Sequence, residues 1–150
     1  MIKFFPTKDS LHSQRIRILA GVCAFMLMGF AMPSLLRAAD PAGEVKQVFA
    51  GKLPNVPGKS LTAVVVDYPP GGKTPAHRHA GSVFAYVLSG KIRSENSVTG
   101  PAKVYYAGDS FFEPAGSEHL VSENASDSEP ASLLAVFVAD DGATLTTMSK

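Results

Sequence analysis

Residues 71–90 read GGKTPAHRHAGSVFAYVLSG, and this stretch decides the fold. Two histidines, His77 and His79, stand two positions apart, and an apolar run from Val83 to Leu88 follows them. Side chains at positions i and i+2 of a strand point to the same face, so the two imidazoles converge on one point. Convergent imidazoles suit a divalent metal ion.

The rest of the chain after residue 40 carries an all-β pattern. Short runs of β-branched and aromatic residues are separated by Gly, Pro, Asn and Asp, and no apolar stripe with helical period occurs there. Strands are predicted over residues 45–50, 61–68, 83–89, 91–95, 103–106, 110–113, 119–123 and 132–138, with a turn region over 96–102. Short strands with such dense turn signals indicate a sandwich or a barrel.

Two motifs make the pattern more specific. The first, G-x5-H-x-H-x3-E-x6-G, is matched by Gly71, His77, His79 and Gly90. The second, G-x5-P-x-G-x2-H, is matched by Gly108, Pro114, Gly116 and His119. With both motifs in this order, the chain resembles the cupin superfamily, in particular the small single-domain bacterial cupins known as the cupin type-2 conserved barrel. The resemblance implies a double-stranded β-helix, or jelly-roll barrel, over residues 40–150, with one divalent metal ion on His77, His79 and His119.

One departure from the first motif bears on the metal. Val83 stands where the motif carries a glutamate, and its side chain cannot ligate an ion. Glu113 or Glu95 could replace that carboxylate if the strands bend suitably. Glu118 should face away from His119, and Glu123 lies about 13 Å along the strand, at about 3.3 Å per residue, which is too far for one ion.

The ligand set also bears on the choice of ion. Three imidazoles alone suit iron, copper, nickel and zinc better than manganese, which prefers more oxygen ligands. We therefore expect Fe2+, with Zn2+, Ni2+, Cu2+ and Mn2+ as alternatives. Open coordination positions would accept water, dioxygen or a small ligand.

Alternation along the central run predicts two unlike faces. Val83, Ala85 and Val87 share the face that we expect to line the pocket with the histidines. The opposite face carries Phe84, Tyr86 and Leu88 and needs a cover, which a homodimer would supply.

Residues 1–39 have the layout of a signal peptide. Lys3, Lys8, Arg15 and Arg17 precede an uncharged apolar stretch over residues 18–36, which Arg37-Ala38-Ala39 follows. We expect cleavage near residue 38 or 39 and a periplasmic or secreted protein. The alternative is a retained anchor in the inner membrane formed by residues 18–36. A single barrel domain would then occupy residues 40–150.

Composition excludes several classes of function for residues 40–150. Cys23 is the only cysteine, so disulfides, thiolate ligands and cysteine nucleophiles are absent from this part. Nine Lys and Arg stand against twelve Asp and Glu there, a net charge of −3 without a basic run. Nucleic-acid binding therefore has no electrostatic support.

Three functions fit these features. Three-histidine cupins resemble metal-dependent dioxygenases, so the first is an oxidoreductase acting on an unknown small molecule. The second is a non-catalytic periplasmic module that binds or senses a small molecule or metal. The third is a metal-free structural barrel. No general acid or base stands out beyond the histidines, so the catalytic residues and the substrate stay unidentified.

Overall fold

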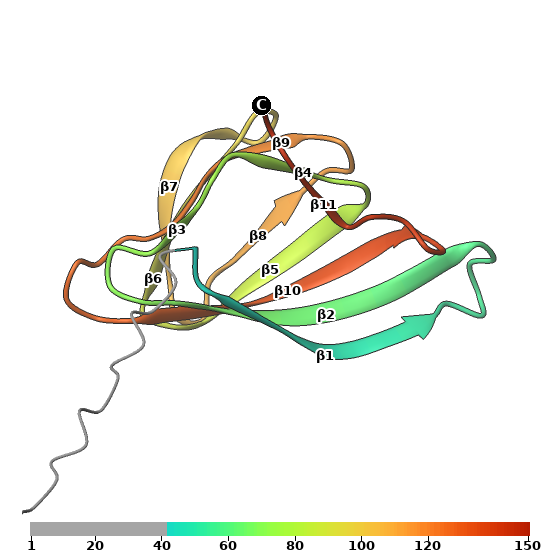
Figure 1. Cartoon of the computed structure of the whole chain (residues 1–150), viewed down its shortest axis with the longest axis horizontal. Coiled ribbons are helices and arrows are strands. Elements are labelled where there is room, and N and C mark those ends of the chain that lie inside the picture. Colours follow the sequence, from blue (N-terminus) through green and yellow to red (C-terminus); the bar gives the residue numbers. More distant parts are fainter. Residues whose placement is uncertain (1–41) are drawn as a thin grey trace, which may run out of the picture. The chain divides into compact units, whose positions relative to one another are not determined.

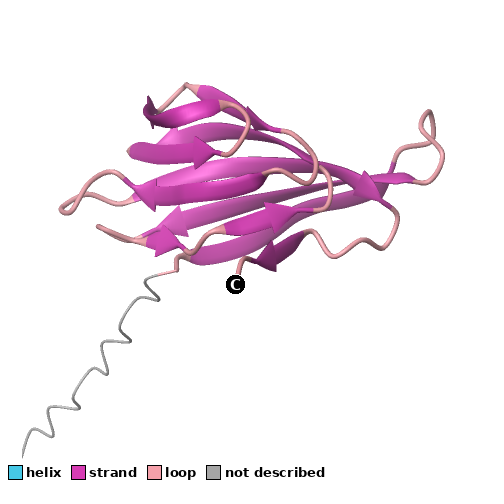
Figure 2. Ribbon diagram, turned by 90° about the horizontal axis from the view of Figure 1, so that it is seen from above, coloured by secondary structure: helices cyan, strands magenta, loops and turns pink. Residues whose placement is uncertain are grey.

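The computed structural model describes residues 42–150, which are built from antiparallel strands with no helix among them (Figures 1 and 2). The strands of this part are β1 Glu44–Lys52, β2 Lys59–Tyr68, β3 Lys73–Thr74, β4 His77–His79, β5 Ser82–Ser89, β6 Lys91–Asn96, β7 Gly100–Tyr106, β8 Ser110–Glu113, β9 Glu118–Asn124, β10 Ala131–Asp140 and β11 Thr146–Met148. Because residues 42–150 form no helix, this part of the chain contains no helix that could span a membrane. The predicted signal segment lies outside the described residues.

The strands form two sheets that enclose one interior. One sheet has the order β1-β2-β10-β5-β8, and the other has the order β11-β4-β9-β6-β7 with β3 paired to β9. Strands far apart in sequence lie side by side in both sheets, because β10 lies between β2 and β5, and β9 lies between β4 and β6 (Figure 1). The expected all-β barrel is confirmed.

The apolar core lies on the inner face of the first sheet. Val83, Ala85 and Val87 of β5 are at most 1% exposed, while Phe84, Tyr86 and Leu88 between them are 39–47% exposed. The predicted alternation is therefore present. The buried core cluster comprises Val64, Tyr68, Val83, Val87, Ile92, Ala131, Leu133, Ala135 and Phe137.

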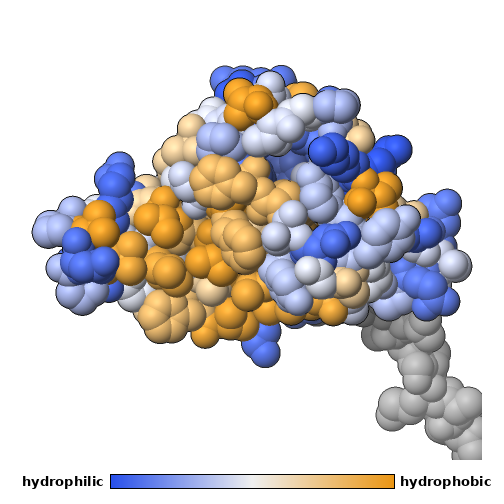
Figure 3. Space-filling model, turned by 180° about the vertical axis from the view of Figure 1, so that it is seen from behind, coloured by the Kyte–Doolittle hydropathy of each residue, from blue (hydrophilic) through white to orange (hydrophobic). Residues whose placement is uncertain are grey.

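The outer face of the first sheet carries uncovered apolar side chains. Phe84 pairs with Phe112 across β5 and β8, and these two side chains are 47% and 52% exposed. Figure 3 views the molecule from behind and shows apolar residues gathered over a broad area of the face it presents. Exposed apolar area of this kind often marks an interface. The homodimer stays a prediction.

All eight predicted strands are present, but three short ones were missed. β3, β4 and β11 have two or three residues each and no apolar run, so their sequence carries no strand signal. The predicted turn region was too long. Asn96 ends β6 and Gly100 already begins β7, so only residues 97–99 connect the two strands.

Gly90 shows why the first motif ends on glycine. Its φ is +68°, in the left-handed region that favours glycine. A Cβ atom there would also lie 2.5 Å from the carbonyl oxygen of Pro130. The residue therefore allows β5 to turn into β6 against the start of β10.

Candidate metal centre

The fold brings the three predicted histidines together. His77 and His79 lie on β4, and His77 pairs directly with His119 of β9. All three side chains are buried, with exposed fractions of 3–7%. One ring nitrogen from each lies within 4.8 Å of the others. We call His77, His79 and His119 the histidine cluster; it is positioned to bind a metal ion.

Two backbone carbonyls orient the rings of His77 and His79. Nδ1 of His77 lies 2.8 Å from the carbonyl oxygen of Pro75, and Nδ1 of His79 lies 3.1 Å from that of Leu145. A carbonyl only accepts hydrogen bonds, so the single N–H of each neutral ring belongs on Nδ1. Both Nε2 atoms then carry a lone pair, and they lie 3.1 Å apart. The two Nε2 lone pairs face each other, and neither nitrogen carries a proton that could bridge them. A cation bound by both would remove their repulsion.

Burial keeps the cluster neutral. Loss of solvent lowers the pKa of His77, and it lowers the pKa of His79 to about 4 and that of His119 to about 3. Charge on the neighbouring imidazoles lowers the last two values further. At neutral pH all three rings are therefore unprotonated at one nitrogen, which is the form that binds metals.

Glu113 is the carboxylate that the structure brings to the histidines. Its side chain is 3% exposed, and its Oε2 lies 3.1 Å from Nδ1 of His119 and 3.8 Å from Nε2 of His79. Burial raises the pKa of Glu113 to about 7, while a hydrogen bond from Asn96 acts in the opposite direction. The inward direction follows from strand alternation, since Phe112 is exposed and Glu113 is buried.

The other candidate carboxylates lie elsewhere. Glu95 alternates with the buried Ser94 and Asn96 on β6, so it points to the opposite side of that strand. Glu118 pairs with Arg78, and Glu123 lies 2.6 Å from Arg93. None of the three approaches the histidine cluster closely enough to join it in an ion pair at 4.0 Å or less.

A small cavity adjoins the cluster. Its volume is about 50 Å³, above the roughly 10–15 Å³ that a cavity needs to hold one water molecule. Val83 and Ala85 line it, while Val87 is buried in the core and is not among the lining residues. The complete lining consists of Val66, Tyr68, His79, Val83, Ala85, Phe111, Glu113, His119, Ser122, Leu133 and Ala135.

Three hydroxyl groups form a second buried polar group, which sequence reasoning missed. The Tyr68 hydroxyl lies 2.6 Å from Oγ1 of Thr74 and 3.0 Å from Oγ of Ser122. We call Tyr68, Thr74 and Ser122 the hydroxyl cluster. Burial raises the pKa of Tyr68, so its phenol stays protonated and can donate. Because the three residues lie on β2, β3 and β9, their spacing in the sequence does not predict that they meet.

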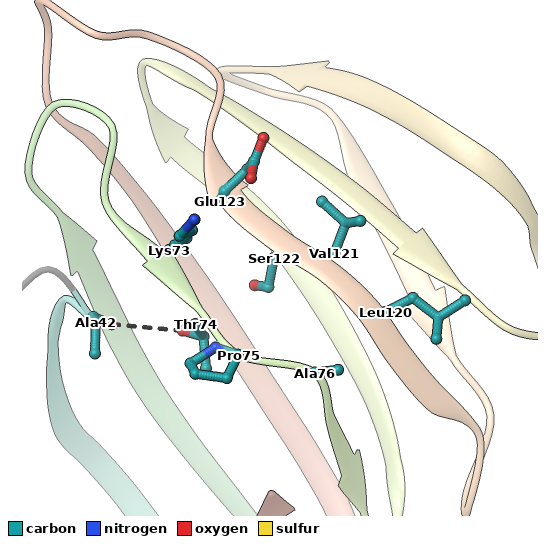
Figure 4. A pocket seen from close by; sticks show the side chains of 9 residues that line it. All are labelled: Ala42, Lys73, Thr74, Pro75, Ala76, Leu120, Val121, Ser122 and Glu123. Atoms are coloured by element: carbon teal, nitrogen blue, oxygen red, sulfur yellow. Dashed lines mark hydrogen bonds between the residues drawn. The ribbon is translucent and has the colours of Figure 1, made fainter. Parts of the chain in front are cut away.

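The hydroxyl cluster separates the inner cavity from a pocket at the surface. Thr74 and Ser122 line this outer pocket, whose volume is about 440 Å³, and Ser122 also lines the inner cavity. Figure 4 shows Thr74 and Ser122 on neighbouring strands, with Thr74 hydrogen-bonded to the backbone of Ala42. The outer pocket contains no histidine, so it is distinct from the candidate metal site.

The chain matches known proteins over the region that carries both motifs. The family model described as a cupin domain matches residues 64–137. A germin-like protein (subfamily 2 member 2) of Arabidopsis thaliana is 26% identical over 137 residues, which cover 89% of this chain. The chain spans 58% of the length of that relative.

Solved structures share the fold at low sequence identity. An uncharacterised protein of Klebsiella pneumoniae with a double-stranded β-helix domain is 22% identical, with a TM-score of 0.59 over 76% of this chain and 90% of that one. Oxalate oxidase in complex with glycolate is 20% identical, with a TM-score of 0.55 over 74% of this chain and 57% of that one. Both motifs, the antiparallel barrel and these matches agree, and residues 64–137 form a small domain of the cupin superfamily.

Proposed function

We propose that this protein is an exported cupin that binds one divalent metal ion on His77, His79 and His119 and uses it to activate dioxygen toward a small molecule. The observation that supports metal binding is the pair of Nε2 atoms 3.1 Å apart, each on a ring whose N–H is directed at a backbone carbonyl. No donor among the described residues lies between these two acceptors, and a cation would satisfy both.

The residues present suit a transition metal. Imidazole nitrogens are good ligands for iron, copper, nickel and zinc, and the ordering of His77 and His79 by carbonyl groups is typical of metal sites. We expect Fe2+. A bound ion with open positions would supply Lewis acidity and, if redox-active, activation of dioxygen.

The size of the inner cavity supports a small reactant. About 50 Å³ is far below the roughly 300–1,000 Å³ of sites that enclose drug-sized ligands. Its walls are mainly apolar, and its ionisable groups apart from Tyr68 are His79, His119 and Glu113. This favours chemistry with a molecule of the size of dioxygen over isomerisation, which needs placed acids and bases.

Two other functions give different results in the same assays. A module that only binds or senses would take up metal and gain thermal stability, without consuming dioxygen or any substrate. A metal-free barrel would show neither response. Cupin chemistry varies on one fold, so oxygen uptake by the metal-loaded protein is the deciding measurement between the first two.

The metal proposal is tested by metal content. The protein is purified without a histidine tag and compared with a His77→Ala, His119→Ala double variant. Arg78→Ala is the matched control, since Arg78 stands between the two β4 histidines but is exposed and pairs with Glu118. We expect about one ion per chain in the wild type and the control and none in the double variant. Absence of metal from the wild type after incubation with Fe2+ and Zn2+ would overturn the proposal.

Export is a separate proposal that rests on residues 1–39. Expression of the full chain in a bacterial host, followed by fractionation and intact mass measurement, tests it. Loss of residues up to about 38 or 39 together with a periplasmic or secreted location supports cleavage. An uncut chain in the membrane fraction supports the anchor over residues 18–36, and an uncut chain in the cytosol contradicts both.

A further inference from the structure

Glu113 lies directly opposite the position where the first motif carries its glutamate. Val83 of β5 pairs with Glu113 of β8 in the antiparallel register. Both side chains are buried, at 1% and 3% exposure, and both point into the barrel. Directly opposed residues of antiparallel strands have Cβ atoms only about 4.5–5.5 Å apart. A carboxylate at position 113 therefore reaches the same part of the interior as one at position 83 would.

The distances around Glu113 are close to those between ligands of a single ion, one within the expected range and one somewhat longer. Two ligand atoms bound at about 2.1 Å lie about 3.0 Å apart at a right angle and about 3.4 Å apart at the tetrahedral angle. Oε2 of Glu113 lies 3.1 Å from Nδ1 of His119 and 3.8 Å from Nε2 of His79. The Ser94 hydroxyl lies 2.8 Å from Nε2 of His119, so Nδ1 is the ring nitrogen that faces Glu113.

The same oxygen has no partner among residues 42–150. Oε2 of Glu113 accepts no hydrogen bond there, and its only ion-pair contacts at 4.0 Å or less are to His79 and His119. A buried carboxylate oxygen without a cation or a donor is unfavourable, and a metal ion beside Oε2 would remove that penalty.

We propose that Glu113 is the fourth protein ligand of the metal ion, supplied by β8 in place of the motif glutamate that is absent from β5. This inference rests on the proposed metal site of the three histidines. It changes the ligand set from three imidazoles to three imidazoles and one carboxylate, which lowers the formal charge of the site by one. An oxygen ligand also makes Mn2+ and Fe2+ better suited to the site than a histidine-only set would.

A different role for Glu113 makes a different prediction. A carboxylate that only orients His119 would act through the ring and would not touch the ion. Its replacement by glutamine, which can still accept a hydrogen bond, would then weaken metal binding by no more than the roughly 10–100-fold typical of a supporting group and would leave the ligands of the ion unchanged. Moving the carboxylate to β5 brings it to the same part of the interior from the opposing strand, so recovery of affinity there would support direct ligation.

The test uses three variants of the full chain at Glu113, Val83 and Glu123, with His77→Ala as the variant that loses the histidine site. Glu113→Gln removes the charge. The double variant Val83→Glu, Glu113→Val exchanges the two opposed residues and keeps their total volume nearly constant. Glu123→Gln is the matched control, because Glu123 lies on β9 but pairs with Arg93 away from the histidines. Affinities for Co2+ and Mn2+ are measured by competition with a chelator, and the visible spectrum of the Co2+ form reports its ligands.

We expect Glu113→Gln to weaken Mn2+ binding by more than the roughly 10–100-fold caused by loss of a group that only supports a metal ligand, and to change the Co2+ spectrum. The exchanged variant should bind within about threefold of the wild type, and Glu123→Gln should equal it. Unchanged affinity and an unchanged Co2+ spectrum in Glu113→Gln, while His77→Ala abolishes binding, would overturn the role of Glu113 and leave the histidine site standing. A wild type that binds neither ion would overturn both. If the exchanged variant does not fold, the affinity and spectrum of Glu113→Gln decide alone.

Discussion

The barrel holds two buried polar groups that are built in opposite ways. In the hydroxyl cluster, the Tyr68 hydroxyl lies within hydrogen-bond distance of both Thr74 and Ser122. In the histidine cluster, two lone pairs face each other, and the nearby Oε2 of Glu113 has no hydrogen-bond partner among the described residues. The first group satisfies itself, whereas the second gathers acceptors that suit a positive charge.

This difference distinguishes a buried polar group that only stabilises the fold from one that is suited to bind a ligand. Buried polar groups normally find partners, and a group left without one calls for an explanation. Hydroxyls can both donate and accept, so three of them can close a network on their own. In neutral imidazoles whose N–H groups already donate to backbone carbonyls, the remaining lone pairs can only accept, as can a carboxylate, so these atoms need a donor or a cation.

Metal removal should produce the largest effect and should act through the histidine cluster alone. An ion at about 1,000 times its Kd stabilises the folded state by about 4 kcal/mol. For a domain of about 100 residues this raises Tm by at least about 15 °C. Thermal unfolding with and without a chelator measures it. Equal Tm values in the two conditions, after metal loading, would mean that the two clusters do not differ as described.

His79→Ala should remove metal binding while leaving the hydroxyl cluster intact. It deletes a ligand outright, and we expect affinity to fall by more than the roughly 10–100-fold caused by loss of a supporting group. A competition titration with a chelator gives the affinity. Arg78→Ala on the same strand serves as the control and should bind metal as the wild type does.

Tyr68→Phe should lower stability without affecting the metal. Loss of the phenol removes hydrogen bonds to Thr74 and Ser122 and should cost about 1 kcal/mol, or about 4–8 °C in Tm. Metal affinity should stay within about twofold of the wild type. A large loss of affinity in this variant would show that the two clusters are coupled and that the hydroxyl cluster is not merely structural.

Changes on the outer face of the first sheet should leave both clusters unaffected. Phe84 and Phe112 are about half exposed, and substitutions at such positions usually change stability by no more than about 0.5 kcal/mol. If the predicted dimer forms through this face, Phe84→Ser with Phe112→Ser should convert it to a monomer with unchanged metal affinity. Gel filtration with light scattering reads the mass. A wild-type protein with the mass of a single chain would contradict the dimer.

Much of the site could be predicted from short-range patterns, and the rest could not for identifiable reasons. The spacing of His77 and His79 places both rings on one face of a strand, whatever lies around them. Glu113 was only one of two candidate carboxylates. Alternation turns it inward, but its place opposite Val83 depends on the pairing of β5 with β8, which lie more than 20 residues apart along the chain. The outward direction of Glu95 depends likewise on β6.

The sequence by itself determined the all-β class, the eight longer strands and the two faces of β5, because period-2 alternation and turn residues act locally. It also indicated which three histidines belong together. Only the tertiary structure decided which nitrogen of each ring is free. The carbonyls of Pro75 and Leu145 that orient His77 and His79 are held in place by β4, β9 and β11. Every residue has a backbone carbonyl that can accept a hydrogen bond. Only the register of the paired strands decides which carbonyls lie beside the histidine rings.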